Sequence, residues 1–393
     1  MEFYEDFPKF MGSYRILDKI GEGTFSSVYK AVDLMHFQYD NTSWCQDHNA
    51  DRRWLAAASR LKDIYPLPQL YLERRMSDQL ATTACGLVAV KRIYATSSPM
   101  RIHNEVQLLH KLSGHPNVAP IINVLRHQDQ VILVLPFLKH DEFRDFFLTL
   151  PCDDVRAYLR ALFSGLKHIH SHGVVHRDIK PANFLYSVQH KSGAIVDFGL
   201  AQPDETESLK KWILDPTVNC VARRDVLRMN ARLSQSKHES NGYIVDPSKP
   251  AVRANRAGTR GFRAPEVLLK VVYQTTALDI WSVGVIILSF MTGIYPFFQS
   301  KSDEEALLEI ALLFGKKEMA AAAAEQHRVF TSNVPTLPES APSLHALCSK
   351  LQPKRSEQFP ESAFDLLRQC LMLNPERRIT AADALEHPFL KMP

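Results

Sequence analysis

The sequence predicts an α+β fold with two lobes, in which a strand-rich first third is followed by a mainly helical remainder. Segments with the alternating or continuous hydrophobicity of β-strands occur up to residue 135, together with one helical pattern. Beyond residue 139, apolar side chains instead recur with the helical period. We therefore expect an N-terminal lobe of residues 1–138 and a C-terminal lobe of residues 139–393.

Strands in the first lobe are predicted by short apolar patterns bounded by turn residues. The predicted strands are residues 16–20, 27–31, 87–93 and 130–135. A helix is expected to begin after Ser98, because serine suits the N-cap and Pro99 suits the first helical position. Gly114 is expected to end this helix.

Helices are predicted for most of the second lobe. Apolar residues follow the helical period over residues 155–169, and Gly173 ends the pattern. The most apolar run, residues 280–292, is too short to span a bilayer and predicts a buried helix. Two later helices are expected to begin at capping boxes, each with an aspartate three residues after Ser362 or Thr380.

Three long stretches interrupt these patterns and are interpreted as insertions: residues 32–86, 203–257 and 314–360. The first contains Trp44 and Trp54, and aromatic residues are enriched at interfaces. These tryptophans are consistent with a partner-docking surface, with packing onto their own lobe, or with a segment that is partly disordered or wrongly predicted coding sequence. We favour packing or disorder over docking.

Composition excludes several classes of protein. The net charge of +4 on 393 residues is too small to indicate nucleic-acid binding, so no direct nucleic-acid partner is expected. No segment resembles a signal peptide or a membrane span, so no membrane association is expected. The six cysteines are scattered without the spacing of a metal site, which favours reduced thiols.

Two patterns in the first lobe are typical of phosphate binding. Gly21 and Gly23 lie between two predicted strands, where glycines let backbone amides approach a phosphate, although Ser26 replaces the third glycine of G-x-G-x-x-G. Lys91 lies near the end of an alternating strand, and Glu105 on the following helix is its candidate partner. Taken singly, a plain hairpin turn, a solvated lysine and an exposed carboxylate are the better explanations of these residues.

The strongest signal lies in the second lobe. Residues 176–183 read His-Arg-Asp-Ile-Lys-Pro-Ala-Asn, and residues 197–199 read Asp-Phe-Gly. This series supplies a base, a cation and two metal ligands, which are the groups that phosphoryl transfer needs. The whole series in this order resembles eukaryotic protein kinases, and the resemblance covers most of the chain outside the insertions. It implies a bilobal protein-kinase-like fold that uses ATP and Mg²⁺.

The resemblance assigns catalytic roles residue by residue. Lys91 is expected to contact the α- and β-phosphates of ATP while paired with Glu105. Asp178 is expected to accept the proton of the substrate hydroxyl, with Lys180 near the transferred phosphate. The lysine in His-Arg-Asp-Ile-Lys-Pro resembles the serine/threonine branch of the family rather than the tyrosine branch. An arginine directly before the catalytic aspartate, as Arg177 is here, often signals control by a phosphate on the activation segment, for which residues 206–208 and 234–240 offer candidate acceptors.

The resemblance also implies binding residues for metal and nucleotide. Asn183 and Asp197 are expected to hold the magnesium ions. The adenine pocket is expected to use Val28 and Ala89 as roof, Leu185 as floor, Leu135 as gatekeeper, and Pro136 to Leu138 as hinge, beside the loop of Gly21 and Gly23. Since proline has no N–H, Pro136 offers only its carbonyl, and the amide of Leu138 would be the donor to the ring.

Residues 258–266 look like the end of the activation segment, with Thr259, Arg260 and Arg263 as expected substrate-binding residues. Two guanidiniums there would favour an acidic or phosphorylated residue after the phosphoacceptor. Alternatively, the arginines tie down the loop or pair with acidic groups nearby. The resemblance also implies two structural features: Glu266 is expected to pair with Arg378, and Asp279-x-Trp281 is expected to anchor the central helix.

Details narrow the resemblance to the cell-division-cycle kinase family that triggers DNA replication origins, in its fungal form. They are Ile-Gly-Glu-Gly-Thr-Phe-Ser-Ser-Val-Tyr at residues 20–29, and the segments 96–105, 183–186 and 196–202. The resemblance implies a nuclear enzyme that phosphorylates subunits of the minichromosome-maintenance helicase and depends on an activating regulatory subunit. A pseudokinase scaffold and a kinase of another cell-cycle branch are the alternatives.

Overall fold

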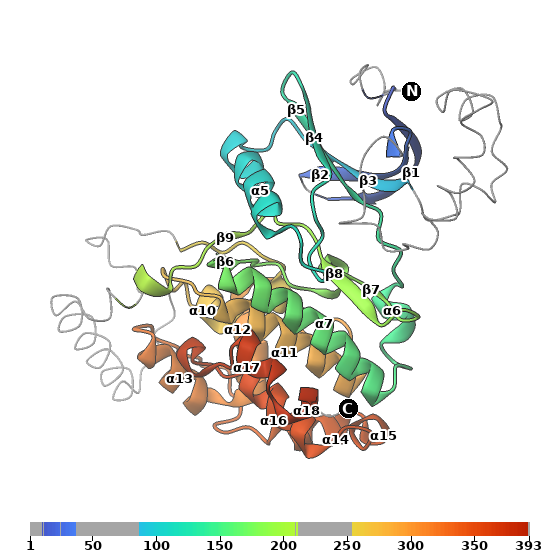
Figure 1. Cartoon of the computed structure of the whole chain (residues 1–393). Helices are drawn as coiled ribbons and strands as arrows, with labels where there is room; N and C mark the ends of the chain where they lie inside the picture. The colour runs from blue at the N-terminus through green and yellow to red at the C-terminus, as the bar shows by residue number, and fades with distance from the viewer. Residues whose placement is uncertain are drawn as a thin grey trace, which may run out of the picture. The chain divides into compact units, whose positions relative to one another are not determined.

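The computed structural model describes residues 10, 12–23, 25–36, 86–208, 210 and 254–391. Contacts within the chain divide it into two compact units, an N-terminal unit, Met1–Lys139, and a C-terminal unit, His140–Pro393. Figure 1 labels the helices and strands of both units along the chain. The strand-rich first part and the helical second part predicted from the sequence are both present.

The N-terminal unit contains a five-stranded antiparallel sheet in the order β1-β2-β3-β5-β4. Its elements are β1 (Tyr14–Glu22), β2 (Ser26–Asp33), β3 (Leu87–Ile93), helix α5 (Pro99–Leu112), β4 (Asn123–His127) and β5 (Gln130–Pro136). Strand β3 has the predicted bounds, and β1, β2 and β5 are longer than predicted. No sequence pattern indicated β4, because its residues are exposed or only partly buried and show no regular alternation.

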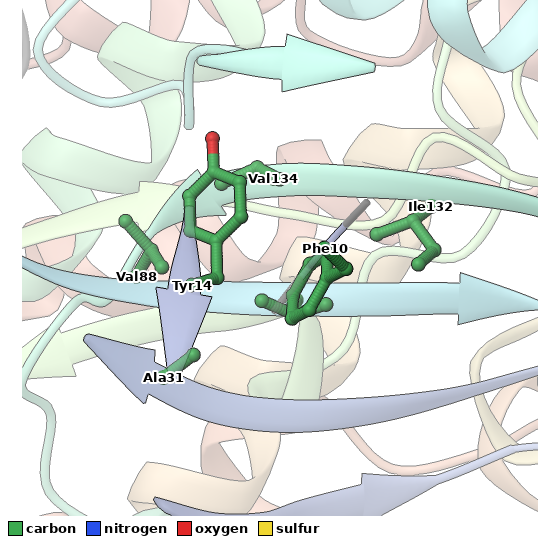
Figure 2. Close-up of a cluster of buried hydrophobic side chains, with 7 residues drawn as sticks. Phe10, Tyr14, Ala31, Val88, Ile132 and Val134 are labelled. Atoms are coloured by element: carbon green, nitrogen blue, oxygen red, sulfur yellow. The ribbon is translucent and has the colours of Figure 1, made fainter. Parts of the chain in front are cut away.

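The two faces of this sheet have different surroundings. Strand residues alternate between faces, so Val88, Val90, Ile132 and Val134 point to one side. They pack with Phe10, Tyr14 and Ala31 in a buried hydrophobic cluster, of which Figure 2 labels every member except Val90. The opposite face carries the side chains between them, including the residues expected to bind nucleotide. The core cluster therefore fixes which strand residues can serve a ligand.

In the C-terminal unit, helices surround the fully buried helix α11 (Ala277–Thr292), in which every residue from Leu278 onward is buried. The other helices are α6 (Phe143–Phe146), α7 (Cys152–Ser171), α10 (Pro265–Leu268), α12 (Asp303–Phe314), α13 (Lys316–Glu325), α14 (Leu344–Leu351), α15 (Pro353–Ser356), α16 (Glu361–Cys370), α17 (Ala381–Leu385) and α18 (Pro388–Lys391). Among the described residues, no helix is long and apolar enough to cross a membrane.

Short elements carry the segments with expected catalytic residues. They are strands β6 (Val174–Val175), β7 (Phe184–Ser187), β8 (Ser192–Ile195) and β9 (Gln202–Pro203), and the 3₁₀ helices η3 (Pro181–Asn183), η4 (Arg260–Phe262) and η5 (Pro375–Arg377). Strands β6 and β9 pair with each other, as do β7 and β8. Helix α7 packs against β6, β8 and α17, so the longest helix of the unit supports this region.

Two regions near the end of the chain differ from their sequence patterns. Residues 314–360, which were interpreted as an insertion because they interrupt the regular patterns, contain the helices α13, α14 and α15. The alanines of α13 are the best helix formers, and Gly315, with φ of 90°, turns the chain between α12 and α13.

The capping box expected at Ser362 is also absent, since α16 begins at Glu361 with Pro360 as its N-cap. The Ser362 hydroxyl has no hydrogen-bond partner among the described residues. The box at Thr380 is confirmed, because its side chain accepts a hydrogen bond from the amide of Asp383.

Most of the other two interpreted insertions lie outside the described residues. Residues 37–85, with Trp44 and Trp54, belong to this part of the chain, and so do residues 211–253. The described cysteines, Cys152, Cys348 and Cys370, are free thiols.

Replacing Gly284 by alanine tests the packing of α11 against α16. An added Cβ would lie 2.6 Å from Leu371 Cδ2 and 3.1 Å from Cys370 Cβ. Because overpacking a filled core costs about 1–3 kcal/mol, we expect Gly284→Ala to lower the thermal unfolding midpoint by several degrees. Gly12→Ala is the matched control, since its Cβ would meet no atom within 4 Å. Equal midpoints for the two variants would contradict this packing.

Candidate active site

Asp178 lies at the centre of a hydrogen-bonded group in the C-terminal unit. Lys180 Nζ donates to its Oδ2 at 2.7 Å, and the side-chain amide of Asn183 donates to the same oxygen at 2.9 Å. Thr259 donates to Oδ1 through both its hydroxyl, at 2.6 Å, and its backbone amide, at 2.9 Å. The Thr259 hydroxyl also accepts a hydrogen bond from Lys180. Both carboxylate oxygens are therefore oriented by donors.

These donors keep Asp178 ionised. Burial alone would raise its pKa, but the hydrogen bond and charge of Lys180, with the hydrogen bond from Thr259, outweigh burial and hold the pKa below its usual value. A carboxylate can accept a proton only when it is ionised. The site therefore presents a charged, oriented acceptor at neutral pH.

His176 fixes the backbone that leads into Asp178. Its ring Nδ1 accepts a hydrogen bond from the Asp178 amide at 3.3 Å, and Nε2 lies 3.1 Å from the carbonyl oxygen of Val196. The ring also contacts Phe198 edge-on, with centroids 5.0 Å apart. One imidazole thus connects the segment of Asp178 with the segment of Asp197.

The two expected magnesium ligands occupy neighbouring segments. The backbone amide of Val196, next to Asp197, donates to the carbonyl of Asn183 at 3.0 Å. Because the Asn183 amide nitrogen donates to Asp178, its side-chain oxygen is turned away from that carboxylate. Within the described ranges, no group of three or more His, Cys, Asp or Glu side chains could hold a metal. An amide and a carboxylate oxygen suit Mg²⁺, which takes its remaining ligands from phosphates and water.

The expected nucleotide residues of the N-terminal unit share one face of its sheet. Val28 is paired with Lys91, and Ala89 is paired with Leu135, so all four side chains lie opposite the hydrophobic core cluster. Val28, Ala89 and Leu135 are half-buried. Pro136 pairs within β5 and is buried, as is Leu138. In the C-terminal unit, half-buried Leu185 lies on β7 between buried neighbours.

The pairing expected for Lys91 is confirmed. Its Nζ donates to Glu105 Oε1 at 2.6 Å, and both side chains are buried. The pair joins β3 to α5 within the N-terminal unit. At the glycine turn, Gly21 pairs with Val28, and the Gly23 amide donates to the carbonyl of Ser26 at 2.8 Å. In this structure the Gly23 amide therefore closes the turn.

Arg260 and Arg263 converge on a carboxylate that the sequence analysis did not single out. Arg263 Nη1 lies 2.7 Å from Asp303 Oδ1, and Arg260 Nε lies 3.7 Å from the same oxygen. Arg256 Nη1 lies 3.3 Å from Asp303 Oδ2. The alternative reading, that these arginines pair with acidic groups nearby, is thus what the structure contains. We call Arg256, Arg260, Arg263 and Asp303 the arginine cluster.

Comparison with known proteins identifies the family. The model of the protein kinase domain matches residues 78–221 and 239–390. The chain belongs to the protein kinase family. It is 40% identical over 98% of its length to the cell cycle serine/threonine-protein kinase hsk1 of Schizosaccharomyces pombe, covering 74% of that protein. It is 38% identical to the cell cycle protein kinase spo4 of the same yeast, over 98% of this chain and 86% of spo4.

The similarity extends beyond yeast. The chain is 27% identical over 99% of its length to a human cell division cycle 7-related protein kinase, of which it covers 92%. A probable cell division control protein 7 homolog from Encephalitozoon cuniculi is 35% identical over 96% of this chain and 92% of its own length. The chain is therefore a serine/threonine protein kinase of this cell-cycle type, and it uses ATP.

Glu266 and Arg378 form the expected buried ion pair of the kinase, with oxygen–nitrogen distances of 2.7 and 3.0 Å. The Arg378 guanidinium also lies over the ring of Trp281 on α11, 5.3 Å from its centroid. The pair therefore connects Arg378, at the end of η5, with α10, and the hydrogen bond from Arg378 to the carbonyl of Ala277 connects both with α11.

Arg177 is buried, and burial lowers its pKa to about 10. Its Nη2 donates to the carbonyl of Asn255 at 3.0 Å, whereas Nε and Nη1 have no hydrogen-bond partner among the described residues. Of the candidate phosphate acceptors, residues 206–208 are among the described residues, whereas residues 234–240 lie outside them. Arg177 is thus attached to the described end of the activation segment.

Arg256 and Asp303 are the site residues that sequence reasoning missed. Arg256 carried a signal, since it lies four residues before Arg260 in the same basic stretch. Asp303 carried none, because it reads as an ordinary first-turn aspartate of a capped helix, 40 residues away from Arg263. Only the fold brings it to the arginines.

Replacing Thr259 by valine tests how Asp178 is kept ionised. The change removes a hydrogen-bond donor to the carboxylate, so the pKa of Asp178 is expected to rise. Phosphate transfer is lost as pH falls through the pKa of the base. The acidic limb of the kcat/KM profile should therefore move to higher pH in Thr259→Val but stay in place in Thr259→Ser. An unmoved limb in Thr259→Val would show that the hydroxyl does not set this pKa.

Proposed function

We propose that this kinase acts at the initiation of DNA replication, phosphorylating subunits of the minichromosome-maintenance helicase in the nucleus together with an activating regulatory subunit. Support comes from segments 20–29, 96–105, 183–186 and 196–202, which resemble the origin-triggering family. Similarity over 98% of the chain to a cell cycle serine/threonine kinase agrees with this role. The chemistry of the proposal depends on one observation, the oriented and ionised carboxylate of Asp178.

In the proposed reaction, Asp178 accepts the proton of the substrate hydroxyl as the oxygen attacks the γ-phosphate of ATP. Lys180, whose Nζ lies 2.7 Å from Asp178 Oδ2, lies near the transferred phosphate and balances its negative charge. In the N-terminal unit, Glu105 holds Lys91 extended for the nucleotide phosphates. Bound Mg²⁺, held by Asn183 and Asp197, would neutralise phosphate charge.

The arginine cluster favours substrates with an acidic residue after the phosphoacceptor. It connects to the base through the backbone, because Arg263 Nε donates to the carbonyl of Gly258, and the next residue, Thr259, contacts Asp178. A residue beside the phosphoacceptor is only about 3.3–3.6 Å further along an extended peptide. Its carboxylate would receive charge-assisted hydrogen bonds from the guanidiniums.

A kinase of another cell-cycle branch is the second candidate. The identity to spo4 is 38%, close to the 40% to hsk1, so similarity alone does not separate branches. A pseudokinase scaffold has less support, since Lys91, Asp178, Asn183 and Asp197 are all present and Lys91 has its partner.

Replacing Asp178 by asparagine tests the chemistry and the partner together. We expect phosphate transfer from ATP to a Ser-Asp peptide to fall about 10²–10⁴-fold, because the base is lost. Asp145→Asn, the same change at an exposed helical position, should leave the rate unchanged.

Each protein is assayed alone and with the proteins that co-purify from its own cells. Transfer that requires the co-purified proteins and is lost in Asp178→Asn would support an activating subunit. Equal turnover by the isolated chain would exclude that dependence, and no transfer in any preparation despite tight ATP binding would support the scaffold.

Peptide preference separates the branches. Peptides that differ only in the residue after serine, aspartate or lysine, are compared by kcat/KM at low ionic strength. Since the arginines attract an acidic residue and repel lysine, we expect the Ser-Asp peptide to be the better substrate. Equal values would exclude the proposed acidic preference.

A further inference from the structure

The carboxylate of Asp303 neutralises part of the charge that the arginine cluster presents to a substrate. Its side chain is only 12% exposed, and three guanidiniums lie within 4 Å of its oxygens. Three positive charges and one negative charge leave a local excess of about two positive charges. The positive charge of the arginines is therefore partly neutralised by Asp303 before any substrate is bound.

The arginines do not need Asp303 to stay in place. Arg263 Nε donates to the carbonyl of Gly258 at 2.9 Å, and Arg260 donates to the carbonyl of Lys301. Removing the Asp303 charge would therefore leave two of the three guanidiniums tied to the backbone. Such a change alters the charge of the cluster more than its geometry.

The helix that carries Asp303 is also independent of its carboxylate. Helix α12 is capped by Ser302, whose side chain accepts a hydrogen bond from the Glu305 amide at 3.1 Å. Glu304 and Glu305 supply further negative charge in its first turn. Asparagine is close in size to aspartate and keeps a side-chain oxygen for Arg263.

The cluster lies beside the expected phosphoacceptor site. Arg256 and Arg260 are partly exposed, with side-chain exposures of 53% and 41%, so they can reach a bound peptide. An incoming carboxylate is attracted by these guanidiniums and repelled by Asp303 at the same time. Asp303 thus works against the selectivity that the arginines create.

We propose that Asp303 is a specificity-determining residue of this kinase, a positioning group that limits the preference for an acidic residue after the phosphoacceptor. The inference rests on the proposed acidic preference and adds the group that sets its size. Asp303 acts through the arginines and does not contact the reacting atoms. Its effect belongs to substrate binding, and so to KM, and not to the transfer step.

Asp303→Asn is the decisive variant. Two peptides that differ only in aspartate or asparagine after the phosphoacceptor serine are compared by kinetics, and fluorescent versions are compared by binding anisotropy. Asp303→Asn removes one unit charge that we place roughly 4 Å from the substrate carboxylate, near water. The preference for the Ser-Asp peptide over the Ser-Asn peptide is therefore expected to rise about fivefold. The gain should lie in KM and Kd, and it should shrink with added salt.

Three further variants serve as controls. Glu304→Gln removes the same charge from the next residue of the same helix turn, where the side chain is exposed, and should not change the preference. Asp303→Glu keeps the negative charge that Asp303→Asn removes, so its preference should stay close to that of the wild-type protein. Arg256→Gln removes a positive charge at an exposed position and should lower the preference, which keeps a test available if Asp303→Asn folds poorly.

The outcomes separate this inference from the proposed function. The role of Asp303 would be overturned if the Ser-Asp preference of Asp303→Asn did not exceed that of the wild-type protein, or if Glu304→Gln raised the preference equally. This holds even if the wild-type protein prefers acidic peptides. Conversely, suppose that the wild-type protein shows no acidic preference while Asp303→Asn shows one. That result would overturn the proposed acidic preference and support the role of Asp303. Because anisotropy needs no turnover, both results can be read from an inactive preparation.

Discussion

The buried carboxylate of Asp279 is the constraint on which the catalytic segment depends. Its oxygens accept hydrogen bonds from the backbone amides of His176 and Arg177, both at 2.8 Å, and Nε2 of His170 lies 3.0 Å away. Arg177 has φ of 72°, in the left-handed region that costs an ordinary residue about 1–2 kcal/mol. The two hydrogen bonds to Asp279 offset that cost. Since Asp279 belongs to the fully buried α11, the strained segment is fixed to the core of its unit.

Charged residues that are buried explain why the motifs could be read so far from the sequence alone. A buried charge is tolerated only with a partner, so the charged positions of a motif imply paired residues elsewhere. The pairs of Lys91 with Glu105 and of Glu266 with Arg378 were expected from the resemblance to protein kinases, and both are present as buried pairs. Strand β3 was predicted closely because most of its residues are apolar and buried, and α5 because Ser98 and Pro99 mark its start.

The sequence failed where the deciding contact is distant or the local pattern is weak. Strand β4 has no buried residue, so it lacks the alternation that reveals a strand. The helices after Phe314 were hidden by prolines, which in fact lie mainly in the turns between them. Asp303 reads as a first-turn aspartate of α12, where negative charge favours the helix, so local rules explain it without any distant partner. Its arginine partners come from another part of the chain, and no local pattern contains that information.

The C-terminal unit places positive charge in two groups with different consequences. Lys180 is matched to Asp178 one to one, and its hydrogen bond lowers the pKa of that carboxylate, so its charge is used to keep the base ionised. The arginine cluster has more cations than carboxylates, so it retains charge for another molecule. A balanced pair fixes a protonation state, whereas an unbalanced cluster attracts a ligand. Substrate preference can therefore change through residues such as Asp303 without altering the group that performs proton transfer.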